Sequence, residues 1–91
     1  MSEQNMAATN NKIRQFVLEK FPAFHQKGLQ DRDSIIESGI VDSMGMLEIV
    51  AFIETEFGVG VEDTDLTPEN FQSISALSKF IKTKREPMSK N

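Results

Sequence analysis

The chain has no cysteine, tryptophan or tyrosine, and only one histidine in 91 residues. Without cysteine it can form neither a disulfide framework nor a thiolate metal site, so any thiol chemistry must come from a group added to the chain. No apolar run approaches the roughly 20 residues of a membrane span. The N-terminal residues lack the apolar core of a secretion signal and the arginines of a transit peptide. We therefore expect a cytoplasmic protein with no membrane span.

Signs of catalysis are also sparse. A chain of this length forms one domain with a modest core, too small for a cleft between two lobes. The single histidine, His25, has no indicated partner, and no serine stands in a Gly-x-Ser-x-Gly motif. The acidic run 62–65 lacks the ligand spacing and central glycine of a calcium loop, so we interpret it as solvated charge. We expect a protein that is not an enzyme and has no metal site.

Charge is divided unevenly along the chain. The formal net charge is −4, but residues 31–69 hold eleven acidic residues and one basic residue, a net charge of −10, and the remainder carries +6. An acidic surface repels phosphate backbones and attracts basic protein surfaces, so we expect no nucleic acid among the partners. A solvated surface without a partner would give the same pattern.

The first part of the chain predicts one helix and a long connection. Thr9 or Asn10 caps a helix whose apolar residues recur at helical spacing until Pro22 ends it. Residues 25–42 then form a connection that is too apolar for a loose linker, and we expect it to pack over the core. Its apolar residues are Leu29, Ile35, Ile36, Ile40 and Val41.

A strongly amphipathic helix is predicted over 43–57, with Asp42 as its N-cap and Gly58 as its C-cap. Its inward stripe consists of Met46, Ile49, Val50, Ile53 and Phe57. A second apolar stripe, on another face, consists of Met44, Leu47 and Ala51. This second stripe is either an exposed docking surface or part of the core, and the pattern favours neither.

The last part of the chain predicts a short helix and a final long one. Thr67 followed by proline begins a short helix that ends near Phe71. Ser73 caps the last helix, whose basic C-terminal residues suit the negative end of the helix dipole. The fold class is therefore all-α, a small bundle of three main helices plus one short helix. We expect a folded domain over 9–84, with flexible tails over 1–8 and 85–91.

One motif has a specific chemical setting. A glycine turn at Gly39 leads into Asp42 and Ser43 at the start of the amphipathic helix. The first N–H groups of a helix are unpaired and the dipole there is positive, so a phosphodiester on the Ser43 oxygen would be stabilised by about 0.3–1 kcal/mol. Taken alone, an Asp-Ser pair is more often a simple helix cap.

The wider pattern resembles the phosphopantetheine-dependent acyl and peptidyl carrier protein family. The resemblance rests on Gly39, the Asp42-Ser43 pair, Met44, Glu48 and the Phe57-Gly58 helix end, and it continues through Leu66, Phe71 and Ser73-Ile74. It covers roughly residues 9–84. Methionine follows the serine where leucine is usual, and Gly45-Met46 replaces a pair that is often acidic. These departures favour D-alanyl carriers, peptidyl carriers or stand-alone carriers of specialised pathways, including polyketide and nonribosomal peptide pathways.

The resemblance implies a function for Ser43. In this family the serine of the Asp-Ser pair receives 4′-phosphopantetheine from coenzyme A, through a phosphopantetheinyl transferase. The arm then carries acyl or aminoacyl groups as thioesters. The implied partners are that transferase, an acyl- or aminoacyl-loading ligase, and downstream acyl-transfer or condensing enzymes. A carrier that visits several enzymes is expected to be a monomer.

The helix that begins at Ser43 is also expected to bind partners. Asp42, Met44, Leu47 and Glu48 would fit a partner that has an apolar pocket with a basic rim. Two other functions remain to be distinguished. One is an unmodified helical adaptor that binds a basic partner through the same acidic helix. The other is a small hydrolase that uses Ser43, which the missing motif and missing base disfavour.

Overall fold

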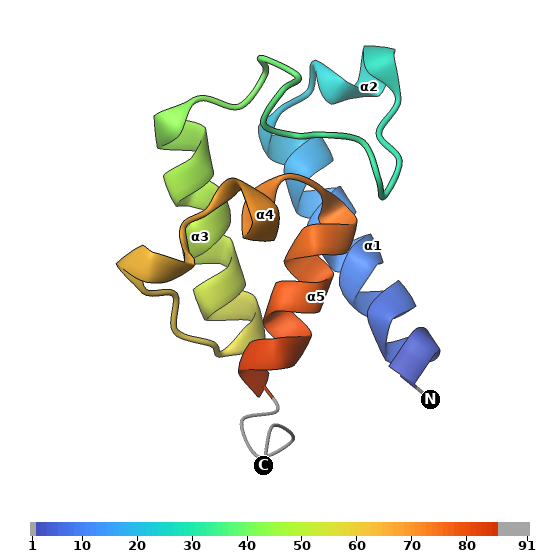
Figure 1. The fold of residues 1–91 in the computed structure, drawn as a ribbon. Helices are drawn as coiled ribbons and strands as arrows, with labels where there is room; N and C mark the ends of the chain where they lie inside the picture. The colour runs from blue at the N-terminus through green and yellow to red at the C-terminus, as the bar shows by residue number, and fades with distance from the viewer. Residues whose placement is uncertain (1, 86–91) are drawn as a thin grey trace.

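The structure is a computed structural model that describes the backbone of residues 2–85 and the side chains of residues 7–85. Three long helices form a bundle, and shorter helical turns lie in the connections between them (Figure 1). The helices are α1 (Ser2–Lys20), α2 (Phe24–Lys27), α3 (Ser43–Phe57), the 3-10 helix η1 (Asp63–Asp65), α4 (Pro68–Phe71) and α5 (Ile74–Arg85). The described residues contain no strand, so the predicted all-α class is confirmed.

Two short helices were not predicted. The four-residue helix α2 contains His25, which was expected on a loop, and its side chain is exposed. The 3-10 helix η1 lies in the acidic run that was interpreted as solvated charge. Both are single turns, which leave too little apolar periodicity to be recognised in a sequence.

The start of the first helix was predicted wrongly. Helix α1 begins at Ser2, before the expected cap at Thr9 or Asn10, so residues 2–8 of the predicted tail are helical. No proline or glycine interrupts residues 2–20, and Ala7 and Ala8 favour a helix, so local propensity carries the helix past the polar residues. The tail predicted over 85–91 lies outside the described residues except for Arg85, which ends α5.

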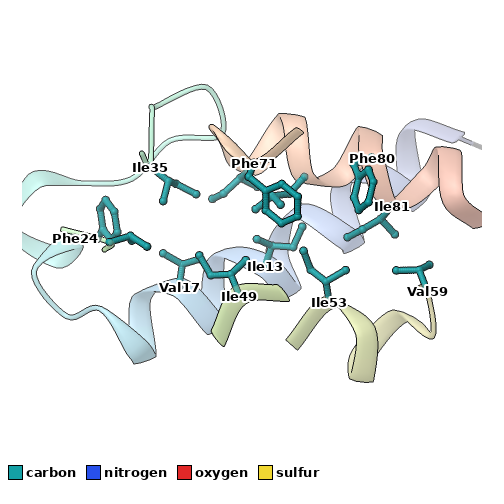
Figure 2. Close-up of a cluster of buried hydrophobic side chains, with 13 residues drawn as sticks. Ile13, Val17, Phe24, Ile35, Ile49, Ile53, Val59, Phe71, Phe80 and Ile81 are labelled. Carbon is teal, nitrogen blue, oxygen red and sulfur yellow. The ribbon is translucent and has the colours of Figure 1, made fainter. Parts of the chain in front are cut away.

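The core lies where the three long helices meet. Ile13 and Val17 from α1 lie beside Ile49 and Ile53 from α3, and all four are almost completely buried (Figure 2). Aromatic rings join the same two helices, because Phe16 stacks on Phe52 with ring centroids 4.2 Å apart. The other buried apolar residues are Phe24, Ile35, Val41, Val59, Phe71, Ile74, Leu77, Phe80 and Ile81.

The long connection between α2 and α3 packs over the bundle, as predicted. Ile35 is fully buried, and its N–H donates to the Gln72 carbonyl at 2.6 Å. The Asp31 carbonyl accepts from the Ser75 N–H at 2.9 Å, and the Asp31 carboxylate pairs with Arg14 of α1. The connection is therefore fixed to α1 and to the start of α5, and it enters α3 from a defined position.

An ion pair fixes η1 to the end of α5. The Lys84 ammonium lies 2.8 Å from an Asp65 carboxylate oxygen, and the same carboxylate accepts from the Glu62 N–H at 3.0 Å. The hydrogen bond from Lys84, with help from that backbone N–H, lowers the pKa of Asp65. The hydrogen bond to Asp65 raises the pKa of Lys84. The acidic run is thus partly structural and not only solvated charge.

This ion pair predicts a pH dependence of stability. The lowered pKa of Asp65 stabilises the fold above its unfolded value of about 3.9, and this contribution is lost as the pH falls through the folded value. The raised pKa of Lys84 stabilises the fold below about 10.4, and this contribution is lost as the pH rises through the folded value. Asp65→Asn removes both contributions. The free energy of unfolding, measured with urea at a series of pH values, should therefore change less with pH in Asp65→Asn than in the wild type at both the acidic and the basic extreme.

The matched control for this prediction is Asp63→Asn, which changes an exposed carboxylate in the same 3-10 helix. It should leave the shape of the wild-type profile unchanged. If the Asp65→Asn profile ran parallel to the wild-type profile at both ends, the ion pair would contribute nothing to folding.

Candidate functional site

The start of α3 has the geometry that the sequence predicted. The Asp42 side chain accepts from the Gly45 N–H at 2.8 Å, and the Asp42 carbonyl accepts from the Met46 N–H at 2.8 Å. Asp42 is therefore the N-cap, and Ser43 is the first residue of the helix. At the other end, Gly58 adopts the left-handed conformation with φ 69°, which glycine enters without steric cost, and ends the helix. Both predicted caps are confirmed.

Ser43 lies at one end of the molecule. Helix α3 begins at the end of the bundle opposite to the start of α1 and the end of α5, as the ribbon shows (Figure 1). The connection between α2 and α3, which the buried Ile35 anchors, leads into the first turn of α3. The Ser43 side chain is exposed, so an enzyme can reach its hydroxyl without unfolding any part of the chain.

The chain's other serines differ from Ser43 in their surroundings. Among residues 12–81, all of which the structure describes, Ser43 is the only exposed serine. Three of the others use their hydroxyl oxygens as acceptors or donors inside loops and caps: Ser34, Ser38 and Ser73. Ser78 is buried and bonds to Asn10, and Ser75 is half-buried. Accessibility therefore singles out the serine of the Asp-Ser pair.

The second apolar stripe on α3 is exposed. Met44 is 70% exposed and Leu47 is 57% exposed, and Ala51 also faces solvent. The stripe is therefore an exposed surface and not part of the core, which are the two possibilities that the sequence left open. Sequence alone could not make that choice, because whether a neighbouring segment covers a helix face depends on the path of the connections.

A small hollow includes Met46 of α3 in its lining. It has a volume of about 200 Å³ and is lined by Ile36, Met46, Leu66, Thr67, Pro68 and Phe71. Ile36 and Leu66 are 37% and 43% exposed, so its rim is apolar. Sequence analysis did not predict that these two residues lie together, because they come from different connections. The apolar character of Ile36, adjacent to the fully buried Ile35, was the available signal.

Gly45 explains one departure from the family pattern. A β-carbon at Gly45 would lie 2.8 and 2.9 Å from two ring carbons of Phe21 and 3.1 Å from a methyl carbon of Val41. These distances are shorter than ordinary van der Waals contact. The absence of a side chain lets the end of α1 pack directly against the first turn of α3, next to Ser43.

Gly45→Ala is expected to destabilise the fold by about 1 kcal/mol. Alanine in a helix gains about 1 kcal/mol over glycine, but an extra methyl group in a packed site costs about 1–3 kcal/mol. The double variant Gly45→Ala with Phe21→Leu should relieve the clash. Denaturant unfolding of the four proteins in this cycle should give a favourable coupling of about 1 kcal/mol. Additive effects would show that the ring moves away without cost.

Comparison with known proteins agrees with this geometry. Residues 12–81 match a family model described as a phosphopantetheine attachment site. The chain belongs to this family. It is therefore a phosphopantetheine-dependent carrier protein, which is not itself an enzyme and which serves partner enzymes. The cofactor expected from the resemblance, 4′-phosphopantetheine, is that of the family.

Two relatives come from Bradyrhizobium diazoefficiens. The carrier protein is 27% identical to aminoacyl carrier protein 1 over 86 residues, which cover 90% of this chain and 96% of the relative. It is 41% identical to aminoacyl carrier protein 2 over 49 residues, which cover 50% of this chain and 55% of the relative. Within residues 2–85, no helix of the carrier protein is long and apolar enough to cross a membrane.

Proposed function

We propose that Ser43 is the attachment site and that the arm on it carries acyl or aminoacyl groups in a specialised biosynthetic pathway. The observation that carries the site assignment is the exposure of Ser43, since it is the only exposed serine within the matched residues 12–81. Its position at the positive end of α3 suits a phosphodiester. The arm, when bound, supplies the thiol that this cysteine-free chain lacks.

The attachment reaction is a phosphoryl transfer from coenzyme A. The Ser43 oxygen forms a bond to the phosphorus next to pantetheine, the pyrophosphate P–O bond breaks, and 3′,5′-ADP leaves. The hydroxyl proton goes to a base of the phosphopantetheinyl transferase. The chain's own part is to hold the hydroxyl accessible, while Asp42 fixes the first turn by accepting from the Gly45 N–H.

The proposed cargo follows from the names of the relatives. Both are aminoacyl carrier proteins, and one of them aligns with 90% of this chain. The proposed partners are a phosphopantetheinyl transferase, an aminoacyl- or acyl-loading ligase, and downstream acyl-transfer or condensing enzymes. A D-alanyl, peptidyl or polyketide pathway would each use the same arm.

The test is intact-protein mass spectrometry after incubation with coenzyme A, magnesium and a broad-specificity phosphopantetheinyl transferase. The carrier protein should gain the mass of one phosphopantetheine, and peptide fragmentation should place it on Ser43. Modification of a different residue would overturn the site assignment. No gain on folded protein would instead favour an unmodified adaptor.

A further inference from the structure

The first turn of α3 carries Ser43 and contains a glycine two residues later. The first N–H groups of a helix have no partner within the helix, so this turn depends on other contacts. Glycine is a poor helix former, so Gly45 weakens the turn further. The Asp42 side chain supplies one contact, by accepting from the Gly45 N–H at 2.8 Å. Without packing against a neighbouring segment, a turn of this composition would open readily.

The Phe21 ring provides that packing. A β-carbon at Gly45 would lie 2.8 and 2.9 Å from two carbons of the ring, and Gly45 is buried. A methyl carbon of Val41 would lie 3.1 Å from the same β-carbon. The turn is therefore enclosed by the end of α1 and by the residue that precedes its cap.

Phe21 is itself fixed in place. It directly follows α1, and its N–H donates to the Val17 carbonyl at 2.8 Å. Its carbonyl accepts from the Phe24 N–H at 3.0 Å. Just before it, the Lys20 ammonium lies 3.7 Å from a Glu48 carboxylate oxygen of α3. These contacts hold the ring where the end of α1 meets the start of α3.

The ring packs on the side of the turn that faces away from Ser43. At about 100° per residue, position 45 lies about 160° around the helix from position 43. Ser43 remains exposed on the other side. Phe21 therefore leaves the hydroxyl open to an enzyme, and it can act on that hydroxyl only through the turn.

We infer that Phe21 is a positioning residue for attachment of the arm to Ser43, because its ring keeps the glycine-containing first turn of α3 closed. This inference rests on the proposed function of Ser43. The transferase must receive the hydroxyl in one orientation, and only chains with a closed turn present it in that orientation. If the turn is open in most molecules, kcat/KM for modification falls in proportion to the closed fraction.

The first test is amide hydrogen exchange followed by NMR, which needs no transferase. In Phe21→Ala, the Gly45 N–H should exchange about tenfold faster or more, because opening of the turn breaks its bond to Asp42. Neither neighbour of Gly45 in the sequence changes, so its intrinsic exchange rate is the same. The Ile53 N–H, within α3, should change only as far as global stability does. Equal acceleration of both amides would overturn the inference.

The second test measures kcat/KM for modification by a broad-specificity phosphopantetheinyl transferase, at a temperature where every variant is folded. Phe21→Ala should lower kcat/KM by about tenfold. Phe21→Met should restore it to within about threefold of the wild type, because methionine is apolar and flexible enough to fill the same space.

Phe16→Ala is the matched control, because Phe16 also packs from α1 against α3, on Phe52 and away from the Ser43 turn. It should lower stability and leave kcat/KM within about twofold of the wild type. An unchanged kcat/KM in Phe21→Ala, or an equal loss in Phe16→Ala, would overturn the role of Phe21 while leaving Ser43 as the attachment site. A wild-type chain that is never modified would overturn both proposals.

Discussion

Ser43→Ala is expected to abolish attachment of phosphopantetheine while leaving the fold intact. The variant lacks the oxygen that forms the new phosphodiester, and no other serine in residues 12–81 is exposed. The loss should be complete, because the proposed attachment is through this single oxygen. The Ser43 side chain is exposed and Asp42 provides the cap, so the circular dichroism spectrum and unfolding midpoint should match the wild type.

Thr55→Ala is the matched control, since Thr55 also carries an exposed hydroxyl group on α3. It should be modified as completely as the wild type. Ser43→Thr tests the reaction further, because the extra methyl group crowds the oxygen but retains it, so slowed modification is expected. Full modification of Ser43→Ala in the mass spectrum would exclude Ser43 as the attachment site.

Ile53→Ala is expected to cause the largest loss of stability among these variants. Ile53 has no exposed surface and lies in the core between α1 and α3 (Figure 2). Truncation of a fully buried isoleucine costs about 2–5 kcal/mol, because its apolar contacts are lost and a cavity remains. For a domain of this size, that corresponds to a fall in Tm of more than about 10 °C. Thermal unfolding monitored by circular dichroism measures it.

Leu47→Ala is the matched control on the same helix. Leu47 is 57% exposed, so its truncation should change the free energy of unfolding by no more than about 0.5 kcal/mol. Ile53→Ala should still be modified normally at temperatures where it is folded. Equal destabilisation by both variants would contradict the assignment of the two faces of α3.

The local features of the site could be read from the sequence because they depend on neighbouring residues. The caps at Asp42 and Gly58 and the inward position of Ile53 are examples, and each was predicted correctly. A cap forms from residues within one turn of each other, and the amphipathic stripe follows from helical periodicity. The start of α1 was missed because the polar residues before Thr9 show no apolar periodicity, which is the main sequence signal of a helix.

Contacts between distant segments could not be read in the same way. The sequence gives Glu48 a charge, but only the packing of α1 against α3 places Lys20 beside it. The sequence likewise does not show why residue 45 is glycine. In the tertiary structure the Phe21 ring packs against Gly45 and leaves no room for a β-carbon. Both effects arise from residues more than twenty positions apart, for which periodicity and propensity carry no information.

The sequence by itself therefore determined the all-α class, the helix that begins at Ser43 and its inward face, because these depend on local hydrogen bonding and helical periodicity. The tertiary structure alone decided which surfaces stay open. The path of the 25–42 connection leaves Met44 and Leu47 uncovered, and helix packing pairs Glu48 and Glu56 with lysines of α1. Exposure and ion pairing are properties of the assembled chain, since both depend on what lies next to a residue in space.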